Sequence, residues 1–365
     1  MTNEASSVLM IPDYSERNPY QSQLGDALDR AGVAVSMGDV SGLAPVLREW
    51  YHNGRPDVVH IHWIHTFINT DRALISALLA CRLLVELLLV RLLGTRVVWT
   101  VHNLLSHKRQ HPRIELTVRQ GVALLASRLI VHCDSAKTDV GRKYSLPDRV
   151  RARLRVVSHG HYRECYPNDV DEAMARKKLD LSRDARVILF FGLIRPYKNV
   201  PRLISTFREV EHDDARLLVV GNPWNESVRE AVVSAAAGDE RVRTVLEYVP
   251  EADIQRYMNA ADVVALPFAS VLTSGSALLA MSFGRPLVLP AIGCPGEVVG
   301  TAGGFQYDPD DSSGLRDALE TAIGTDERLD EMGRRNRRVA EQFDWDTIAE
   351  RTRAVYRLRS GSQQN

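Results

Sequence analysis

The chain has 365 residues, of which 45% are hydrophobic and 25% are charged, the proportions of an ordinary globular protein. Lys and Arg together number 46, as do Asp and Glu, so the formal net charge is zero. This balance argues against general binding of nucleic acid through a basic surface. The length favours two domains, at roughly 100–200 residues each.

The cysteines and the N-terminus indicate the compartment. The four cysteines are widely spaced and form no CxxC pair: Cys81, Cys133, Cys165 and Cys294. This argues against a disulfide-rich scaffold and against a structural zinc site. The first residues, MTNEASSVLMIPDY, carry no basic segment before their short apolar run, so they do not resemble a signal peptide. We expect a cytoplasmic protein.

The first half of the chain alternates apolar and amphipathic segments. The apolar segments predict strands at 7–12, 57–63, 95–103, 128–135 and 153–160. The spacing of apolar residues predicts helices at 19–32, 73–93 and 115–127. Apolar strands that alternate with helices are typical of a parallel sheet covered on both faces. The sequence therefore predicts an α/β fold.

The leucine-rich helix at 73–93 has two interpretations. Its sequence, ALISALLACRLLVELLLVRLL, approaches the roughly 20 apolar residues of a membrane span. Arg82, Glu86 and Arg91 interrupt it at spacings that place them on one side of a helix. One interpretation is a long buried helix packed on a sheet, and the other is a surface that touches a membrane.

A charged segment divides the chain. Residues 162–185 lack a long apolar run and predict a linker with a short helix. Strands then resume at 185–192, 216–222, 242–249, 261–268 and 285–290, with helices near 200–210, 226–237, 251–260, 274–283 and 312–324 and a last helix at 345–359. We predict a first domain at 1–165, a linker at 166–184, a second domain at 185–342 and a closing helix at 343–360.

The segment FFGLIRPYKNVPRLISTF, residues 190–207, places two basic residues between a strand and a helix. Gly192 permits a sharp turn after the strand. Arg195 and Lys198 precede a helix whose first N–H groups are free and whose N-terminus is the positive end of its dipole. These features together favour a diphosphate site. The alternative is a solvated loop.

This segment resembles the Gly-Arg-x-x-x-x-Lys-Gly loop of the retaining GT-B glycosyltransferases of family 4. Four further segments match that family in order: VRTVLEYVPEADIQRYMNAADVVALPF, AMSFGRPLVLPAIGCPGEVV, GGFQYDPDDSSGLRDALETAI and FDWDTIAERTRAVYR. The resemblance implies a GT-B fold of two Rossmann-like domains facing across a cleft. The N-terminal domain would bind the acceptor and the C-terminal domain the nucleotide sugar. Base contacts are implied near Tyr248 and Val249.

One departure from the family concerns two glutamates, spaced E-x7-E, that normally flank the sugar pocket. The match places Val271 and Leu279 at their positions, and no Asp or Glu occurs from Val263 to Gly296. The segment offers instead hydroxyls and backbone N–H groups at a helix start, from Thr273, Ser274, Gly275 and Ser276. We expect these residues to meet the donor, with a plain helix cap as the alternative.

Several histidines lie at strand ends of the first half. The resemblance implies that His102, in TVHN, lies near the donor sugar and supports catalysis, whereas a strand-capping role is the alternative. His60 and His62 would share a strand face, but no cysteine or carboxylate pattern completes a metal site. The family typically needs no metal, so we expect no metal and no cofactor.

Two segments are candidates for acceptor binding. NPYQ replaces the glycine-rich loop that the family carries after its first strand, so Tyr20 and Gln21 are candidates for contacts with a sugar acceptor. The basic segment SHKRQHPR, residues 106–113, would suit an anionic acceptor or a membrane. Plain loops are the alternative for both.

The predicted function is transfer of a hexose from a nucleotide diphosphate sugar to an acceptor hydroxyl, with retention. The resemblance implies a role in polysaccharide, glycolipid or glycoconjugate synthesis, with a sugar, a lipid-linked molecule or a small molecule as acceptor and possible peripheral membrane contact. Two alternatives remain: a transferase that acts on a small soluble acceptor, and a catalytically silent GT-B subunit that binds a partner. The missing glutamates sustain the second alternative.

Overall fold

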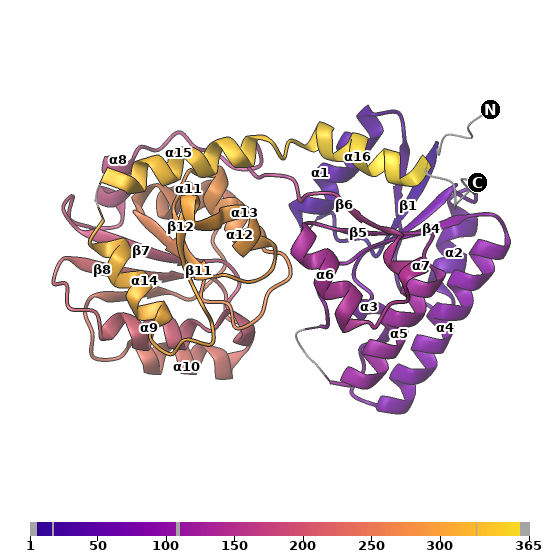
Figure 1. Ribbon diagram of the computed structural model, residues 1–365, viewed down its shortest axis with the longest axis horizontal. Coiled ribbons are helices and arrows are strands. Elements are labelled where there is room, and N and C mark those ends of the chain that lie inside the picture. Colours follow the sequence, from indigo (N-terminus) through magenta and orange to yellow (C-terminus); the bar gives the residue numbers. More distant parts are fainter. Residues whose placement is uncertain (1–5, 17, 107–109, 326, 358–365) are drawn as a thin grey trace. The chain divides into compact units, whose positions relative to one another are not determined.

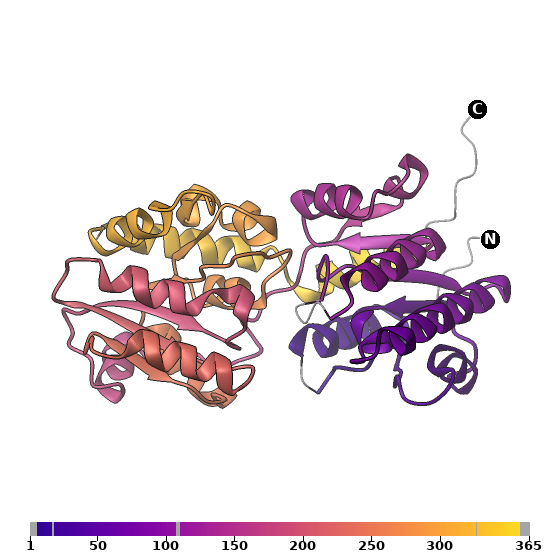
Figure 2. The same ribbon diagram turned by 90° about the horizontal axis from the view of Figure 1, so that it is seen from below.

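The computed structural model describes residues 6–16, 18–106, 110–325 and 327–357. The chain forms two compact units (Figures 1 and 2). The first unit holds the residues up to Gly160 together with those from Phe343 onward, and the second holds His161–Gln342. The segment expected to be a linker, with the short helix α8 (Glu172–Lys178), thus belongs to the second unit.

The first unit is built on a parallel sheet with the strand order β2-β1-β3-β4-β5-β6 in its described residues. The strands are β1 (Ser7–Ile11), β2 (Ala34–Met37), β3 (Val58–Ile61), β4 (Arg96–Thr100), β5 (Arg128–Val131) and β6 (Leu154–Val156). The helices are α1 (Pro19–Arg30), α2 (Pro45–His52), α3 (His65–Ile68), α4 (Ala73–Leu92), α5 (Pro112–Leu125), α6 (Asp134–Lys143), α7 (Asp148–Arg151) and α16 (Trp345–Arg357). The central strands β3 and β5 are buried along their whole length, as strands covered on both faces should be.

The last helix, α16, completes the core of the first unit. The Trp345 ring packs so closely on Gly160 that a Cβ there would lie 2.4 Å from it. The Tyr356 hydroxyl lies 2.7 Å from Nδ1 of His60, a buried residue of the central strand β3. Because these contacts bury the aromatic side chains of α16, the N-terminal half requires the C-terminal end of the chain for its core.

The second unit has a parallel sheet with the strand order β12-β11-β10-β7-β8-β9 in its described residues. The strands are β7 (Arg186–Phe191), β8 (Ala215–Val220), β9 (Val242–Val245), β10 (Val263–Ala265), β11 (Leu287–Pro290) and β12 (Gly304–Tyr307). The helices after α8 are η1 (Pro196–Lys198), α9 (Val200–Arg208), α10 (Glu226–Ala236), α11 (Glu251–Ala260), α12 (Gly275–Ser282), α13 (Gly293–Gly303), α14 (Gly314–Ile323) and α15 (Glu327–Glu341). The strands β10 and β7 are adjacent at the centre of this sheet. Their carboxyl ends therefore lie side by side at the middle of one sheet edge.

The predicted α/β architecture is confirmed, and some elements were not predicted. Those in the first unit are β2, α2, α3, α6 and α7, and those in the second are α13, β12 and α15. In the described part of the chain, β2 is an edge strand that pairs with β1 alone and stays partly exposed. Its short sequence AVSM carries no strong apolar signal, which is why it was not predicted.

The leucine-rich helix α4 is only partly buried. Its buried side faces the unit, whereas leucines along its other side are exposed to solvent. Within the described chain it is the one helix long and apolar enough to cross a membrane by length and composition. The expected long buried helix is thus buried on one side only.

Candidate functional site

The loop after β7 is the centre of the candidate site in the second unit. Gly192 has a φ of 118°, a conformation that side-chain-bearing residues rarely adopt. A Cβ at this position would lie 2.7 Å from Ser276 Oγ and 3.2 Å from Lys198 Nζ. Gly192 therefore allows the chain to pass directly beside these two polar groups.

Lys198 and Ser276 form the polar contact of this site. Lys198 is only 7% exposed, and its Nζ donates a hydrogen bond of 3.1 Å to Ser276 Oγ. Burial, with a smaller contribution from the nearby Arg195, lowers the pKa of Lys198 to about 8. Ser276 lies in the first turn of α12, where Ser274 caps the helix by accepting a hydrogen bond from the Ala277 N–H.

Arg195 lies in the same loop and packs on a residue that follows the next strand. Its guanidinium carbon lies 3.5 Å from the centre of the Trp224 ring, which follows β8, and burial lowers its pKa. Backbone hydrogen bonds join the two loops, from Ile194 N to Asn222 O and from Trp224 N to Ile194 O, both 2.9 Å. Within the described residues neither Arg195 nor Lys198 is paired with a carboxylate. The loop thus holds two cations whose charge is not neutralised.

The remaining predicted donor residues lie at the same edge of the sheet. Thr273 and Gly275 flank the cap of α12 and are partly exposed. Tyr248 and Val249 lie on the loop between β9 and α11, where Tyr248 is 67% exposed. The structure brings Gly192, Lys198 and Ser276 into contact, and it leaves Tyr248 free to meet a ligand.

The two positions of the missing glutamates carry apolar side chains. Leu279 is buried within α12 and Val271 is partly buried on the loop before it. A carboxylate at position 279 would change the packing around it. The site therefore presents hydroxyls and cations and lacks the acidic pair of the family.

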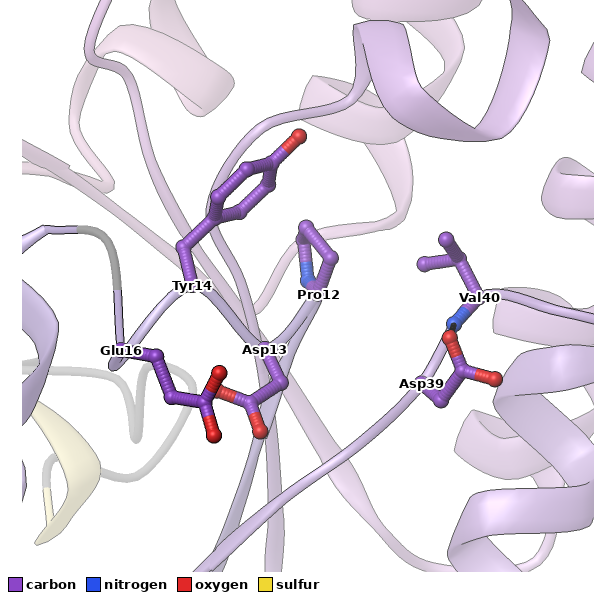
Figure 3. A pocket seen from close by; sticks show the side chains of 6 residues that line it. All are labelled: Pro12, Asp13, Tyr14, Glu16, Asp39 and Val40. Atoms are coloured by element: carbon purple, nitrogen blue, oxygen red, sulfur yellow. Dashed lines mark hydrogen bonds between the residues drawn. The ribbon is translucent and has the colours of Figure 1, made fainter.

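A separate pocket of about 310 Å³ lies in the first unit, at the carboxyl ends of β1 and β2. It is lined by Pro12, Asp13, Tyr14, Glu16, Asp39 and Val40 (Figure 3). Asp13 follows β1 directly after Pro12, and its carboxylate accepts hydrogen bonds from the N–H and hydroxyl of Ser15. Ser41 and then Val40 hold the Asp39 carboxylate and lower its pKa. The volume suits a small ligand.

Two aromatic rings, in contact with each other, lie between the pocket and the predicted catalytic residue His102. Tyr14 packs edge-on against Trp63, with ring centres 5.0 Å apart. Trp63 in turn stacks on His102, with centres 4.6 Å apart and the planes 15° from parallel. The pocket itself combines the Tyr14 ring with carboxylates, which suits a sugar, because C–H faces pack on an aromatic ring and hydroxyls donate to oxygen atoms.

His102 belongs to a buried chain of imidazoles. Its Nε2 lies 3.1 Å from His62 Nδ1, and its Nδ1 lies 3.5 Å from His132 Nε2. His132 Nδ1 must donate to the Val157 carbonyl at 2.9 Å, which leaves His132 Nε2 as an acceptor. His102 Nδ1 then donates to His132 and His62 Nδ1 donates to His102. The free lone pair is His62 Nε2, which has no hydrogen-bond partner.

Burial keeps these histidines neutral. It lowers the pKa of His60 to about 3, that of His132 to about 4 and that of His159 to about 3, and it holds the pKa values of His62 and His102 well below 6.5. Among the described residues no three His, Cys, Asp or Glu side chains are arranged to hold a metal ion. His102 is thus a neutral hydrogen-bonding group in a packed core.

The predicted contacts of Tyr20 and Gln21 with an acceptor do not fit their positions. Gln21 is fully buried, and its amide accepts from the Tyr14 N–H and donates to the Pro12 carbonyl. Tyr20 is 3% exposed and packs among the histidine rings. Asn18 caps α1 and Pro19 begins it, so Tyr20 and Gln21 lie in the first turn of the helix predicted at 19–32. Gln21 fixes the chain that forms the pocket, and an acceptor cannot reach its amide.

Other residues of the two sites were not predicted. Trp224, Asp13 and Trp63 each follow a strand. Ligand sites of parallel sheets lie at the carboxyl ends of strands, so this position could have been used to predict them from the sequence. His132 likewise follows a strand, β5. In the basic segment 106–113, residues 107–109 lie outside the described residues, and Ser106 is tied to Glu115.

Comparison with known proteins places these features in a family. The family described as "Glycosyl transferases group 1" matches residues 185–325. A GDP-mannose:glycolipid 4-beta-D-mannosyltransferase of Xanthomonas campestris pv. campestris is 32% identical over 274 residues, which cover 75% of this chain and 70% of that protein. A D-inositol 3-phosphate glycosyltransferase of Gordonia bronchialis is 29% identical over 277 residues, 69% of this chain and 58% of that protein.

Solved structures show the same fold. A sucrose-phosphate synthase of Thermosynechococcus elongatus superposes with a TM-score of 0.76 at 18% identity, covering 96% of this chain and 98% of that one. Anabaena HepE in complex with UDP and glucose gives 0.70 at 17% identity, with coverage of 95% and 98%. The two Rossmann-like units therefore form a GT-B fold, as predicted. The chain is a glycosyltransferase and belongs to the group 1 glycosyltransferases.

Proposed function

We propose that this chain transfers mannose from GDP-mannose to a hydroxyl group of a glycolipid. The observation that carries the proposal is the pair of cations, Arg195 and Lys198, held without carboxylate partners beside Gly192 and the start of α12. Such a site suits a diphosphate. The choice of mannose and glycolipid follows the name of the Xanthomonas relative.

In the donor half of the reaction, the cations act on the leaving group. Negative charge grows on the diphosphate as its bond to the sugar breaks, and Arg195 and Lys198 are already in place to stabilise it. Two fixed cations supply this charge without a metal ion or another cofactor. Ser276 holds Lys198, Thr273 to Gly275 meet the sugar, and Tyr248 and Val249 meet the base.

We further propose that the new linkage is β, as the name of that relative reads. GDP-mannose carries its mannose in α linkage, so a β product requires inversion. Inversion needs no carboxylate on the donor side at positions 271 and 279, where this chain has Val271 and Leu279. It does need a base for the acceptor. This proposal departs from the retention that the family resemblance implies.

In the acceptor half, the pocket of the first unit binds a sugar of the glycolipid, and Asp13 is the base. The acceptor oxygen forms a bond to the mannose C1 while its proton passes to the Asp13 carboxylate. The C1–O bond to the diphosphate breaks and its electron pair leaves with GDP. Asp13 suits this role because Ser15 holds its carboxylate in place within the pocket. An acceptor of this kind places the enzyme at the cytoplasmic face of a membrane.

The test supplies radiolabelled GDP-mannose, UDP-glucose and ADP-glucose to the purified protein, with and without a glycolipid extract. We expect label in the lipid fraction only from GDP-mannose. Asp13→Asn should lower this transfer by at least a hundredfold and leave GDP affinity unchanged. Glu230→Gln, at an exposed position on α10 outside both sites, is the matched control and should retain transfer. Label in a small soluble product would assign a soluble acceptor instead, and full transfer by Asp13→Asn would exclude Asp13 as the base.

A further inference from the structure

The exposed side of α4 is an apolar stripe that runs the length of the helix. We call it the α4 apolar face; it comprises Leu74, Ile75, Leu78, Val85, Leu88, Leu89, Leu92 and Leu93. Leu74 is 73% exposed and Leu92 is 74% exposed, so the stripe reaches both ends of the helix. Twenty residues of helix extend for about 30 Å. Surfaces of this kind mark interaction sites, since monomeric proteins seldom expose large contiguous apolar patches.

The opposite side of α4 is fixed in the first unit. Glu86 is buried, pairs with Arg82 and accepts a hydrogen bond from the Leu47 N–H at the start of α2. Leu84 packs so closely on Gly121 that a Cβ there would lie 2.7 Å from it, and Figure 1 shows α4 beside α5. A helix held in this way cannot cross a bilayer without leaving its unit. It can lie flat on a bilayer, with only its apolar face inserted.

A group of arginines adjoins the C-terminal end of this stripe. We call it the arginine group; it comprises Arg91, Arg128, Arg149, Arg153 and Arg155. Arg91 donates to the Leu125 carbonyl, and Arg153 donates to the carbonyls of Leu124 and Ala126. Both side chains therefore gather at the end of α5, where Leu124 is exposed.

The charges of these arginines also act on one another. Burial lowers the pKa of Arg128 first, and the charges of Arg155 and Arg153 lower it further. Burial also lowers the pKa of Arg153 first, followed by the charges of Arg91 and Arg149. The bonds of Arg91 and Arg153 to backbone carbonyls leave their charge without neutralisation. A concentrated positive charge next to leucines attracts anionic lipid headgroups.

A second copy of the chain is the competing occupant. Residues 74, 78, 81, 85, 88 and 92 recur every three or four positions, the spacing of a helix–helix seam. The charged residues of α4 are Arg82, Glu86 and Arg91, and Glu86 is buried and already paired. Two such helices would thus bring arginines together with no free carboxylate to meet them. Anionic lipid offers the complementary charge, so the observations favour a bilayer.

We propose that the α4 apolar face and the arginine group dock this protein on an anionic phospholipid bilayer, with α4 parallel to the membrane plane. The inference rests on the proposed function in that a glycolipid acceptor resides in such a bilayer. The leucines insert among the acyl chains near the headgroups, and the arginines bind lipid phosphates. The two contributions differ in their response to salt, because salt screens only the second.

The test is co-sedimentation of the full chain with vesicles, without donor or acceptor. We expect binding to vesicles of phosphatidylcholine with phosphatidylglycerol at low salt, weaker binding as NaCl rises, and little binding to phosphatidylcholine alone. Leu78→Glu combined with Leu92→Glu should lower the bound fraction at least tenfold. Arg149→Ala combined with Arg155→Ala should remove most of the salt dependence. Val233→Glu, an exposed apolar position on α10 in the second unit, is the matched control and should bind as the wild type does.

Two outcomes overturn the proposal. Wild-type protein that stays in the supernatant with anionic vesicles at low salt excludes the bilayer. A dimer seen by light scattering that Leu78→Glu with Leu92→Glu converts to a monomer, without any vesicle binding, assigns the face to a second copy. The thermal unfolding curve of each variant, followed by circular dichroism, shows whether both units are folded. Vesicle binding without mannose transfer would contradict the proposed function alone, and transfer without vesicle binding would contradict this inference alone.

Discussion

Lys198 Nζ donates to Ser276 Oγ at 3.1 Å, across 78 residues of sequence. The contact joins the loop after β7 to the first turn of α12, and it lies directly beside Gly192. It turns two separate sequence features, a basic loop and a hydroxyl-rich helix start, into one site. The predictions for the donor depend on this contact.

Replacement of either cation should weaken binding of the nucleoside diphosphate. Arg195→Ala and Lys198→Ala each remove a charge-assisted contact, which costs on the order of 1.5–3 kcal/mol. The dissociation constant for GDP should therefore rise about tenfold or more, measured by isothermal titration calorimetry. Lys177→Ala, at an exposed position on α8, is the control. Unchanged affinity in both variants would remove the diphosphate site.

Affinity for GDP should fall as the pH rises through about 8. The pKa of Lys198 is lowered to about 8, so the free protein loses this charge above that pH. The phosphate of GDP is already ionised above about pH 7, since its second pKa is about 6. Affinity should then decrease by up to about tenfold per pH unit above pH 8. Lys198→Arg keeps its charge over this range and should show a flat profile; a flat wild-type profile would exclude Lys198 from the site.

His102→Ala should reduce turnover and leave GDP affinity unchanged. The substitution removes the partner of His62 and of His132 and the ring on which Trp63 stacks, so the acceptor side loses its support. Turnover with the glycolipid should fall at least tenfold. His52→Ala, at the exposed end of α2, is the matched control. If His102→Ala keeps full turnover, the residue is only part of the core packing.

The first unit should lose stability as the pH falls below about 6.5. The buried histidines have folded pKa values lowered to about 3 for His60 and His159 and about 4 for His132. Between these values and the unfolded value of about 6.5, only the unfolded chain binds protons, so acid favours unfolding. Each such histidine lowers the free energy of unfolding by about 1.4 kcal/mol for each pH unit that the pH falls within this range. Urea midpoints measured from pH 7.5 to pH 5 should decline steeply, and a level series would show that the cluster is hydrated.

The sequence was sufficient to predict most strands of both sheets, though not β2 or β12. The predicted strands β7 and β8, for example, are apolar and buried along most of their length. The sequence was also sufficient for Gly192 and for the helix start at Val200. The contact of Lys198 with Ser276 could not be predicted from the sequence, because it depends on the pairing of β10 with β7 in the sheet.

The first unit shows where local pattern fails. Asn18 and Pro19 are ordinary helix-start signals, and the predicted helix at 19–32 includes Gln21. Gln21 was nevertheless assigned to an acceptor that it cannot reach. The histidine chain could not be predicted, because His62, His102 and His132 meet only when β3, β4 and β5 lie side by side. The exposure of the α4 apolar face likewise depends on what packs against the helix, which composition does not reveal.

The central claim, β-mannosyl transfer from GDP-mannose to a glycolipid, is tested most directly by the configuration of the transferred sugar. The radiolabelled lipid product of the wild-type protein is divided and digested with a β-specific or an α-specific mannosidase. The account predicts that the β-specific enzyme releases the label and that the α-specific enzyme leaves it on the lipid. Release by the α-specific enzyme alone would contradict inversion, and with it the role assigned to Asp13.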